Sequence, residues 1–220
     1  MRKESLITGE SYHIYNRGVD KRDIFNTIHD LERFKESIKP FNQIESIGSL
    51  EHHRKQGRGL DSPPTEPEPL VAIIAFCINP NHFHFVLKQL VDGGIAKFLQ
   101  KLQGGYTYYF NHKHGRSGSL FQGTFKSKLI DSDEYFRKIF SYTNQNYLVH
   151  DIPNEKLPFI FASDREYECG IFDFVSANEG REMLEIFDGK KNMQKHCTEI
   201  ISIIREERGK TSLVETDELP

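Results

Sequence analysis

Alternating and uniformly apolar stretches predict a group of β-strands in this chain. Residues near 10–18 alternate and are rich in Tyr and Ile, which is typical of a half-buried strand. Residues 70–78 are apolar and rich in β-branched side chains, which favours a central strand buried on both faces. A turn at 79–81 then predicts that residues 82–89 pair back as the next strand.

Helical periodicity marks further segments. Residues 30–42 place Leu31, Phe34 and Ile38 at helical spacing, and a long apolar stripe follows a helix start at Asp92 or Gly93. Within that second helix, Gly104-Gly105 predicts a kink or a close packing contact. Residues 119–130 indicate a strand or an irregular hairpin, and acids in 131–134 open a helix that we expect to run to residue 148.

The pattern indicates one domain followed by an extension. We expect residues 1–150 to form the domain, with a Gly- and Pro-rich insertion at about 49–69. Residues 151–220 are expected to form a C-terminal extension, a loop followed by helices, with a disordered tail.

Composition narrows the class of protein. Hydrophobic residues make up 37% and charged residues 28% of the 220 residues, which is ordinary for a soluble protein. The longest apolar run is too short to cross a bilayer, and three scattered cysteines suit a reducing cytosol, so we expect no membrane partner and a cytoplasmic location.

Charge is unevenly distributed. Residues 88–128 hold seven Lys or Arg and one acid, whereas residues 164–220 hold eight Lys or Arg and fourteen acids. A basic middle and an acidic end indicate an anion-binding face and a region turned away from it, or simply surfaces that are solvated unequally.

His82 and His84 stand two residues apart at the start of an alternating run. Successive side chains of a strand point to opposite faces, so both histidines would share one face. Phe83 and Phe85, buried on the other face, would then direct both imidazoles toward one point, where they can hold a metal ion. The alternative is a strand with two polar residues on a wet face.

Tyr142 and Asn146 lie four residues apart on the helix expected over 133–148, and so stack on one face. They lie beside the apolar stripe, which suits a phenol with a free, partly sheltered hydroxyl and an amide oxygen one turn later. The alternative is an ordinary interface tyrosine.

Covalent transfer at phosphorus is the chemistry that needs these groups together. A neutral phenol is a poor nucleophile, and a divalent ion on His82, His84 and an amide oxygen would polarise a phosphate. Tyr142 would attack phosphorus, stay joined to the 5′-phosphate and free a 3′-OH. Imidazole mixed with hard oxygen, with open positions, favours Mg²⁺ or Mn²⁺ over zinc.

Four stretches together resemble the single-tyrosine HUH transposases of the IS200-like family, and more closely their REP-associated branch. They are YHIYNRG at 12–18, NPNHFHF at 79–85, HGRSGSLFQGTFKS at 114–127, and residues 131–135 leading to Tyr142 and Asn146. They occur in the family's order. Two departures, Phe121 where the family usually has Trp and Tyr147 where it often has Pro, remove no catalytic group.

The resemblance implies an α+β fold of the HUH type, a ferredoxin-like or palm antiparallel sheet flanked by helices. It implies a metal held by His82, His84 and Asn146, with Tyr142 as the nucleophile. The family cuts and rejoins single-stranded DNA at hairpin-forming sites, and palindromic repeats are the implied partner. Either a monomer or a homodimer fits, and a prokaryotic member would associate with the nucleoid.

A surface for single-stranded DNA needs cations for phosphates and other groups for bases. The expected cations are Arg17, Lys113, Arg116, Lys126 and Lys128, and the expected contacts to bases or sugars are His114, Phe121 and Gln122. The alternative for each is a solvated side chain.

Three other functions stay open. One is a domesticated relative that binds hairpin DNA but cuts weakly or not at all. Another is a relaxase or replication-initiation nuclease, which would not explain the Gly-Arg-Ser-Gly stretch. The third is a structural zinc protein, although the chain lacks the cysteine pairs that such sites usually use.

Overall fold

The structure is a computed structural model that describes residues 5–45, 47–48, 50, 68–150 and 152–210. The predicted insertion at about 49–69 lies largely outside the described residues, and the tail predicted to be disordered lies outside them.

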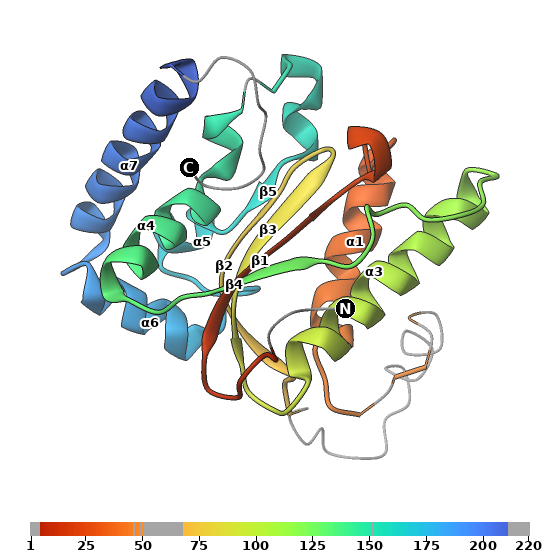
Figure 1. The fold of residues 1–220 in the computed structure, drawn as a ribbon, viewed down its shortest axis with the longest axis horizontal. Helices are drawn as coiled ribbons and strands as arrows, with labels where there is room; N and C mark the ends of the chain where they lie inside the picture. The colour runs from red at the N-terminus through yellow and green to blue at the C-terminus, as the bar shows by residue number, and fades with distance from the viewer. Residues whose placement is uncertain (1–4, 46, 49, 51–67, 151, 211–220) are drawn as a thin grey trace.

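A five-stranded antiparallel sheet forms the centre of the molecule, as Figure 1 shows. Its strand order is β4-β1-β3-β2-β5, and every neighbouring pair is antiparallel. The strands are β1 (Ser11–Arg17), β2 (Val71–Ile78), β3 (His82–Gln89), β4 (Lys126–Leu129) and β5 (Phe161–Ala162). The α+β class and the three strands expected before residue 90 are confirmed.

Helices cover both faces of this sheet. Figure 1 places α1 (Ile28–Phe41) and α3 (Gly94–Lys113) on one side. The other side carries α4 (Asp133–Asn144), α5 (Asp164–Cys169), α6 (Ala177–Ile186) and α7 (Lys190–Lys210). Short 3-10 turns lie between these elements: η1 (Val19–Lys21), η2 (Asn146–Val149) and η3 (Asn154–Phe159).

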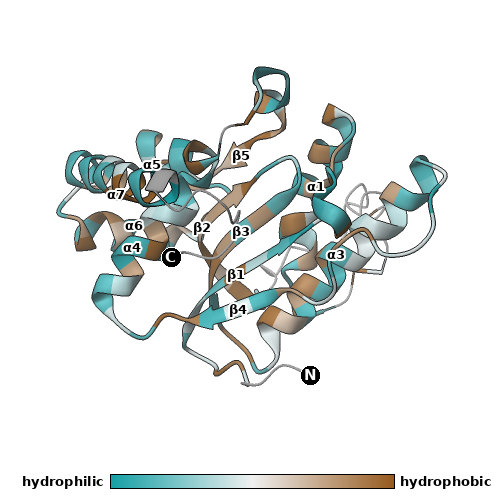
Figure 2. Cartoon of the chain, turned by 45° about the horizontal axis from the view of Figure 1, so that its top comes forward, coloured by the Kyte–Doolittle hydropathy of each residue, from teal (hydrophilic) through white to brown (hydrophobic). Residues whose placement is uncertain are grey.

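Strand register separates an apolar face from a polar one. Tyr15 pairs with His84 and Arg17 with His82, so these four side chains share a face of the sheet. The opposite face buries Phe83 and its neighbours against α1 and α3, where the ring centroids of Phe34 and Phe83 are 6.2 Å apart. Figure 2 shows the resulting hydrophobic band along β2 and the hydrophilic edge strand β4.

The close packing contact expected at Gly105 is present. A Cβ atom built on Gly105 would lie 3.0 Å from Cε2 of Phe41, so α1 and α3 approach each other where no side chain intervenes. The helix α3 continues through this pair to Lys113.

The stretch 119–130 is mostly irregular, and only Lys126–Leu129 forms a strand. Phe121 makes an isolated bridge with Gly18, and the Gln122 amide donates to the Arg17 carbonyl at 2.8 Å. These contacts tie the loop to the end of β1, and Gly115, Gly118 and Gly123 adopt the positive φ values that a regular strand excludes.

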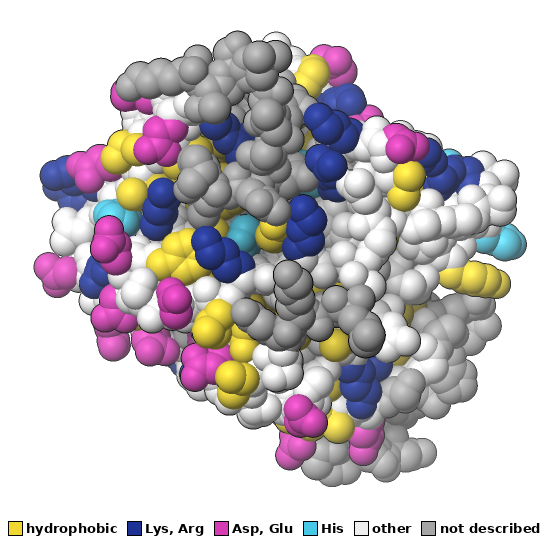
Figure 3. Space-filling view, viewed as in Figure 1, with side chains coloured by type: hydrophobic (Ala, Val, Ile, Leu, Met, Phe, Trp, Pro, Cys, Tyr) yellow, Lys and Arg dark blue, Asp and Glu magenta, His cyan; other side chains and the backbone are white. Residues whose placement is uncertain are grey.

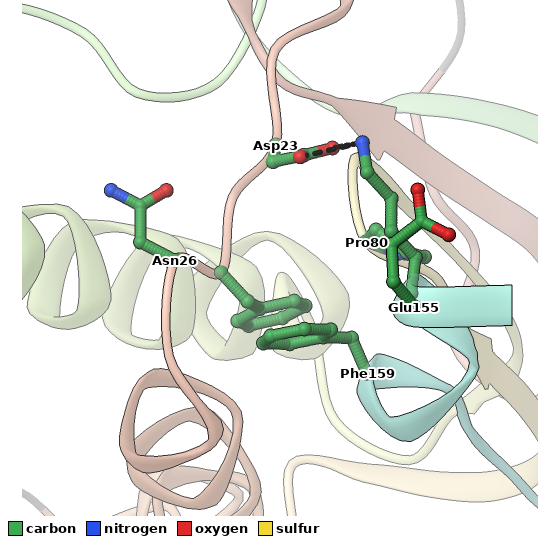
Figure 4. A pocket seen from close by; sticks show the side chains of 7 residues that line it. Asp23, Asn26, Pro80, Glu155 and Phe159 are labelled. Carbon is green, nitrogen blue, oxygen red and sulfur yellow. Dashed lines mark hydrogen bonds and ion pairs between the residues drawn. The ribbon is translucent and has the colours of Figure 1, made fainter. Parts of the chain in front are cut away.

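Residues after 150 join the body of the molecule. The strand β5 pairs with β2, an edge pairing that the sequence pattern did not predict. The Lys156 ammonium donates to the Asp23 carboxylate at 2.7 Å, and both residues line a pocket whose Asp23 and Phe159 are labelled in Figure 4. No helix among the described residues is long and apolar enough to cross a membrane.

Asp30 joins α1 to the end of α3. Its carboxylate accepts from the Asn26 and Thr27 amides, and Thr27 Oγ1 accepts from the Asp30 amide, which completes a capping box. Lys113 Nζ and His114 Nε2 reach the same carboxylate, at 2.8 and 3.0 Å. Burial alone would raise the pKa of Asp30, but these hydrogen bonds outweigh it and lower the pKa to about 2.

We expect Asp30→Asn to lower the free energy of unfolding at pH 7 by about 2 kcal/mol, since the charged form is the one stabilised by its donors. Because the pKa of Asp30 is depressed on folding, this contribution is present above pH 4 and is lost as the pH falls toward about 2. Urea unfolding from pH 7 to 2 measures it. Asp20→Asn, at an exposed carboxylate, is the control, and equal effects of the two variants would contradict the assignment.

Candidate active site

His82 and His84 lie on β3 with their rings nearly perpendicular and their centroids 5.2 Å apart. Both are buried: His82 is 5% exposed and His84 is 0% exposed. The expected common face is therefore present, and it is covered by protein.

His13, on the neighbouring strand β1, fixes the orientation of His84. His13 Nε2 lies 2.9 Å from His84 Nδ1, and the two rings stack with an interplanar angle of 7°. When His84 Nδ1 carries the proton and donates to His13, the lone pair of His84 Nε2 is left available. His84 Nε2 is buried and has no hydrogen-bond partner among the described residues.

Two amides from the preceding turn position His82. Asn81 Oδ1 lies 2.6 Å from His82 Nδ1, which fixes the tautomer whose Nε2 carries a lone pair. On the other side of the ring, His82 Nε2 lies 3.0 Å from Asn146 Oδ1. Asn79 Nδ2 lies 3.0 Å from His82 Nε2 and donates to Asn146 Oδ1 at 2.8 Å, so the Asn79 amide nitrogen occupies the position that these two acceptors share, and a cation bound to both would replace it.

Asn146 reaches this position because the helix ends earlier than the sequence predicted. The α-helix α4 stops at Asn144 instead of continuing to residue 148. Gln145 leaves the helical conformation with φ −129° and ψ 29°, and Asn144 Oδ1 accepts a 2.6 Å hydrogen bond from the Ser163 hydroxyl. Asn146 then begins η2 and is not stacked on Tyr142 along one α-helix as expected.

Tyr142 is more deeply buried than its position beside the apolar stripe predicted. The side chain is 0% exposed, and its ring packs edge-on against His84 with centroids 5.3 Å apart. Its hydroxyl oxygen accepts from Arg208 Nη2, on α7, at 3.3 Å. The phenol therefore lies next to one histidine of the pair, as the sequence analysis required.

Three histidines of this cluster, His13, His84 and His150, have lowered pKa values and are neutral at pH 7. Burial lowers the pKa of His84 well below its ordinary value, with further lowering by neighbouring histidines and by Arg208. Burial, followed by the charge of Lys128, lowers the pKa of His13 to about 3. Burial also lowers the pKa of His150 to about 3, and the His150 ring packs on His82 at 4.7 Å. Neutral imidazoles are the form that binds metals.

The donor set fits a divalent cation. His82 Nε2 and Asn146 Oδ1 lie 3.0 Å apart and share the Asn79 amide nitrogen, and His84 offers a buried nitrogen with an available lone pair. Two imidazoles and an amide oxygen leave coordination positions open for phosphate oxygens. Within the described part of the chain, no three His, Cys, Asp or Glu side chains form a metal-binding group.

Four of the residues expected to bind DNA lie on or next to the polar face of the sheet. Arg17 Nε donates to Gln122 Oε1 at 2.5 Å, at the end of β1. Lys126 and Lys128 lie on the edge strand β4 with their ammonium groups over the rings of Tyr15 and Tyr135 (5.5 and 4.5 Å). Figure 3 shows Lys and Arg side chains gathered near the middle of this view, where Figure 1 places β1 and β4.

The other expected contacts have structural roles. Lys113 and His114 bond to Asp30, as described above. Arg116 donates to Asn111 Oδ1 at 3.1 Å and lies over Phe110. Phe121 is 3% exposed and packs on Phe83 and Tyr106 with centroid distances of 5.8 and 6.5 Å, so its ring belongs to the core.

Sequence reasoning missed His13, Asn79, His150 and Arg208 as members of the cluster. His13 could have been found, because the alternation over 11–17 places it on the same strand face as Arg17. Asn79 stands in the turn beside the histidine pair. No local pattern indicated His150 or Arg208, since their positions depend on η2 and on the packing of α7.

Comparison with known proteins gives a family match for part of the chain. Residues 67–146 match the model of the family described as "Transposase IS200 like", and this range contains His82, His84, Tyr142 and Asn146. The match confirms the resemblance to IS200-like transposases. A solved structure, "Structure of the REP associates tyrosine transposase bound to a REP hairpin", is 17% identical, with a TM-score of 0.49 over 80% of this chain and 90% of that chain. No curated protein matches.

We expect His82→Ala to remove the response of the protein to Mn²⁺. An ion present at about 100 times its dissociation constant stabilises a folded protein by about 2.7 kcal/mol. Thermal unfolding with and without Mn²⁺ should therefore show a higher melting temperature for the native chain and His112→Ala, but not for His82→Ala. A native melting curve that Mn²⁺ leaves unchanged would argue against this metal site.

We expect His13→Gln to weaken Mn²⁺ binding by about 10- to 100-fold, because a ligand that loses its orienting partner binds less well. Calorimetric titration measures the affinity, and far-UV circular dichroism confirms that the variant is folded. His29→Gln, at an exposed position on α1, is the matched control. Equal Mn²⁺ affinities for the native chain and His13→Gln would show that His13 does not orient His84 for metal binding.

Proposed function

We propose that the IS200-like transposase match over residues 67–146 describes the activity of this chain, a metal-dependent cleavage and rejoining of single-stranded DNA at hairpin-forming sites. One observation carries the proposal. The ring of Tyr142 packs on His84, whose Nε2 has an available lone pair; the His82 ring lies 5.2 Å from that of His84, and His82 Nε2 lies 3.0 Å from Asn146 Oδ1. A nucleophile and a candidate ion site thus share one buried cluster.

In the proposed reaction, Tyr142 Oη attacks the phosphorus of a DNA phosphodiester. The P–O3′ bond breaks, the phosphoryl group stays on the tyrosine and the 5′ side of the downstream strand, and the 3′ oxygen leaves with a proton. A bound Mg²⁺ or Mn²⁺ would polarise the phosphate and stabilise its developing charge. His82, His84 and Asn146 would hold this ion. Attack of a 3′-OH on the phosphotyrosine breaks the P–Oη bond, releases Tyr142, which takes up a proton, and rejoins the DNA without a nucleotide cofactor.

The DNA surface that we propose follows β1 and β4. Arg17, Gln122, Lys126 and Lys128 supply cations and an amide on the side of the sheet that also carries the histidines. Hairpin DNA of the palindromic-repeat type is the proposed partner, as for the REP-associated branch.

We further propose that residues 1–150 form the catalytic domain and that residues 151–220 extend it. We also propose that the protein acts in the cytoplasm, in association with the nucleoid.

A second candidate is a relative that binds hairpin DNA but cuts it weakly. The observation that favours it is the complete burial of Tyr142, whose hydroxyl contacts α7 instead of an open surface. Both candidates use the same surface for DNA, and they differ in whether a covalent intermediate forms.

We expect the native protein, with Mn²⁺ and a single-stranded hairpin taken from inverted repeats around its gene, to form a DNA adduct that survives SDS. Tyr142→Phe should abolish this adduct, because it removes the only atom that joins phosphorus. Tyr108→Phe, at a tyrosine that is 76% exposed, should leave it unchanged. Denaturing electrophoresis with labelled DNA makes the measurement. If the protein bound the hairpin but formed no adduct, the second candidate, a relative that binds hairpin DNA and cuts it weakly, would be favoured.

A further inference from the structure

The guanidinium of Arg208 lies inside the cluster that contains the nucleophile. Arg208 is in the last described turns of α7, which packs against α4 and η2. Its Nη2 donates to the hydroxyl oxygen of Tyr142 at 3.3 Å. The same positive charge contributes to the lowered pKa of His84 and of His150, so it also acts at the proposed ion site. The histidine pair and the family match do not account for this residue.

We propose that Arg208 is a catalytic residue that binds the scissile phosphate and holds the Tyr142 hydroxyl toward phosphorus. This inference rests on the proposed function and adds a residue that lies outside the matched range 67–146.

The chemistry of arginine suits this position. A guanidinium carries a positive charge and five N–H donors in a planar fork. One edge can donate to Tyr142 Oη while another donates to a non-bridging phosphate oxygen, as bidentate arginine does with phosphates. Arg208 gives up no proton during the reaction: the phenol proton goes to solvent and the leaving 3′ oxygen takes one up.

Neighbouring charges support a role at phosphate. Attack of the phenol oxygen on a phosphodiester places additional negative charge on the non-bridging oxygens. Arg208, on α7, supplies a positive charge next to the Tyr142 hydroxyl.

The first test measures phosphate contact without cleavage. Tyr142→Phe is the background, and the probe is a fluorescent oligothymidylate of about 20 nucleotides, in Mn²⁺ at several salt concentrations. Loss of one phosphate contact to single-stranded DNA reduces the slope of log affinity against log salt by about 0.7. We expect this reduction for Arg208→Gln and not for Arg208→Lys. Arg205→Gln, an exposed arginine one turn earlier on α7, should keep the full slope.

The second test measures adduct formation by the full-length protein on the hairpin substrate. We expect Arg208→Gln to lower the maximal rate by about 100-fold, the usual effect of removing one donor to a developing oxyanion. Arg208→Lys keeps the positive charge but lacks the planar fork of donors, so we expect it to lower the maximal rate by about tenfold. Melting temperatures and Mn²⁺ affinities equal to those of the native chain would show that neither the fold nor the ion site has changed.

Three results would overturn the proposal. They are an unchanged salt slope for Arg208→Gln, an equal reduction for Arg205→Gln, and an adduct rate that rises when Arg208 is removed, which would mean that α7 shields Tyr142. The native chain could form no adduct while the salt slope of DNA binding still fell only for Arg208→Gln. The proposed function would then be wrong, and the contact between Arg208 and phosphate would be supported.

Discussion

The hydrogen bond between His13 and His84 is the contact on which the polar site depends. It joins two neighbouring strands, β1 and β3, whose register is fixed by the buried face beneath them. A shift of one residue in that register would turn both histidines of β3 into the apolar core. Phe83, between the histidines, packs under α1 and so fixes the strand face that directs their rings. The geometry of the site is therefore set by the hydrophobic core.

A buried cluster of this kind is costly unless its polar groups find partners. His82 lies between Asn81 and Asn146, and His84 has His13 on one nitrogen only. The nitrogen that remains, His84 Nε2, is buried and has no hydrogen-bond partner among the described residues. A cation bound by His82, His84 and Asn146 would give this nitrogen a partner.

The sequence predicted those site residues that lie on a regular strand or helix, where the side-chain periodicity tells which residues share a face. Alternation over 82–87 placed the histidines on one face, and the spacing after Ser132 placed Tyr142 near them. It did not predict where α4 ends: Gln145 leaves the helical conformation, and Asn144, the last residue of α4, bonds to Ser163 in a later segment of the chain. It also missed the two-residue strand β5 and the approach of Arg208, since both arise from tertiary packing of the residues after 150.

The central claim is that His82, His84 and Asn146 share one cation next to Tyr142. Anomalous diffraction from crystals of the protein grown with Mn²⁺ tests it most directly. The account predicts a single strong peak within coordination distance of His82 Nε2, His84 Nε2 and Asn146 Oδ1. A peak elsewhere, or none at this cluster under conditions in which Mn²⁺ raises the melting temperature, would contradict it.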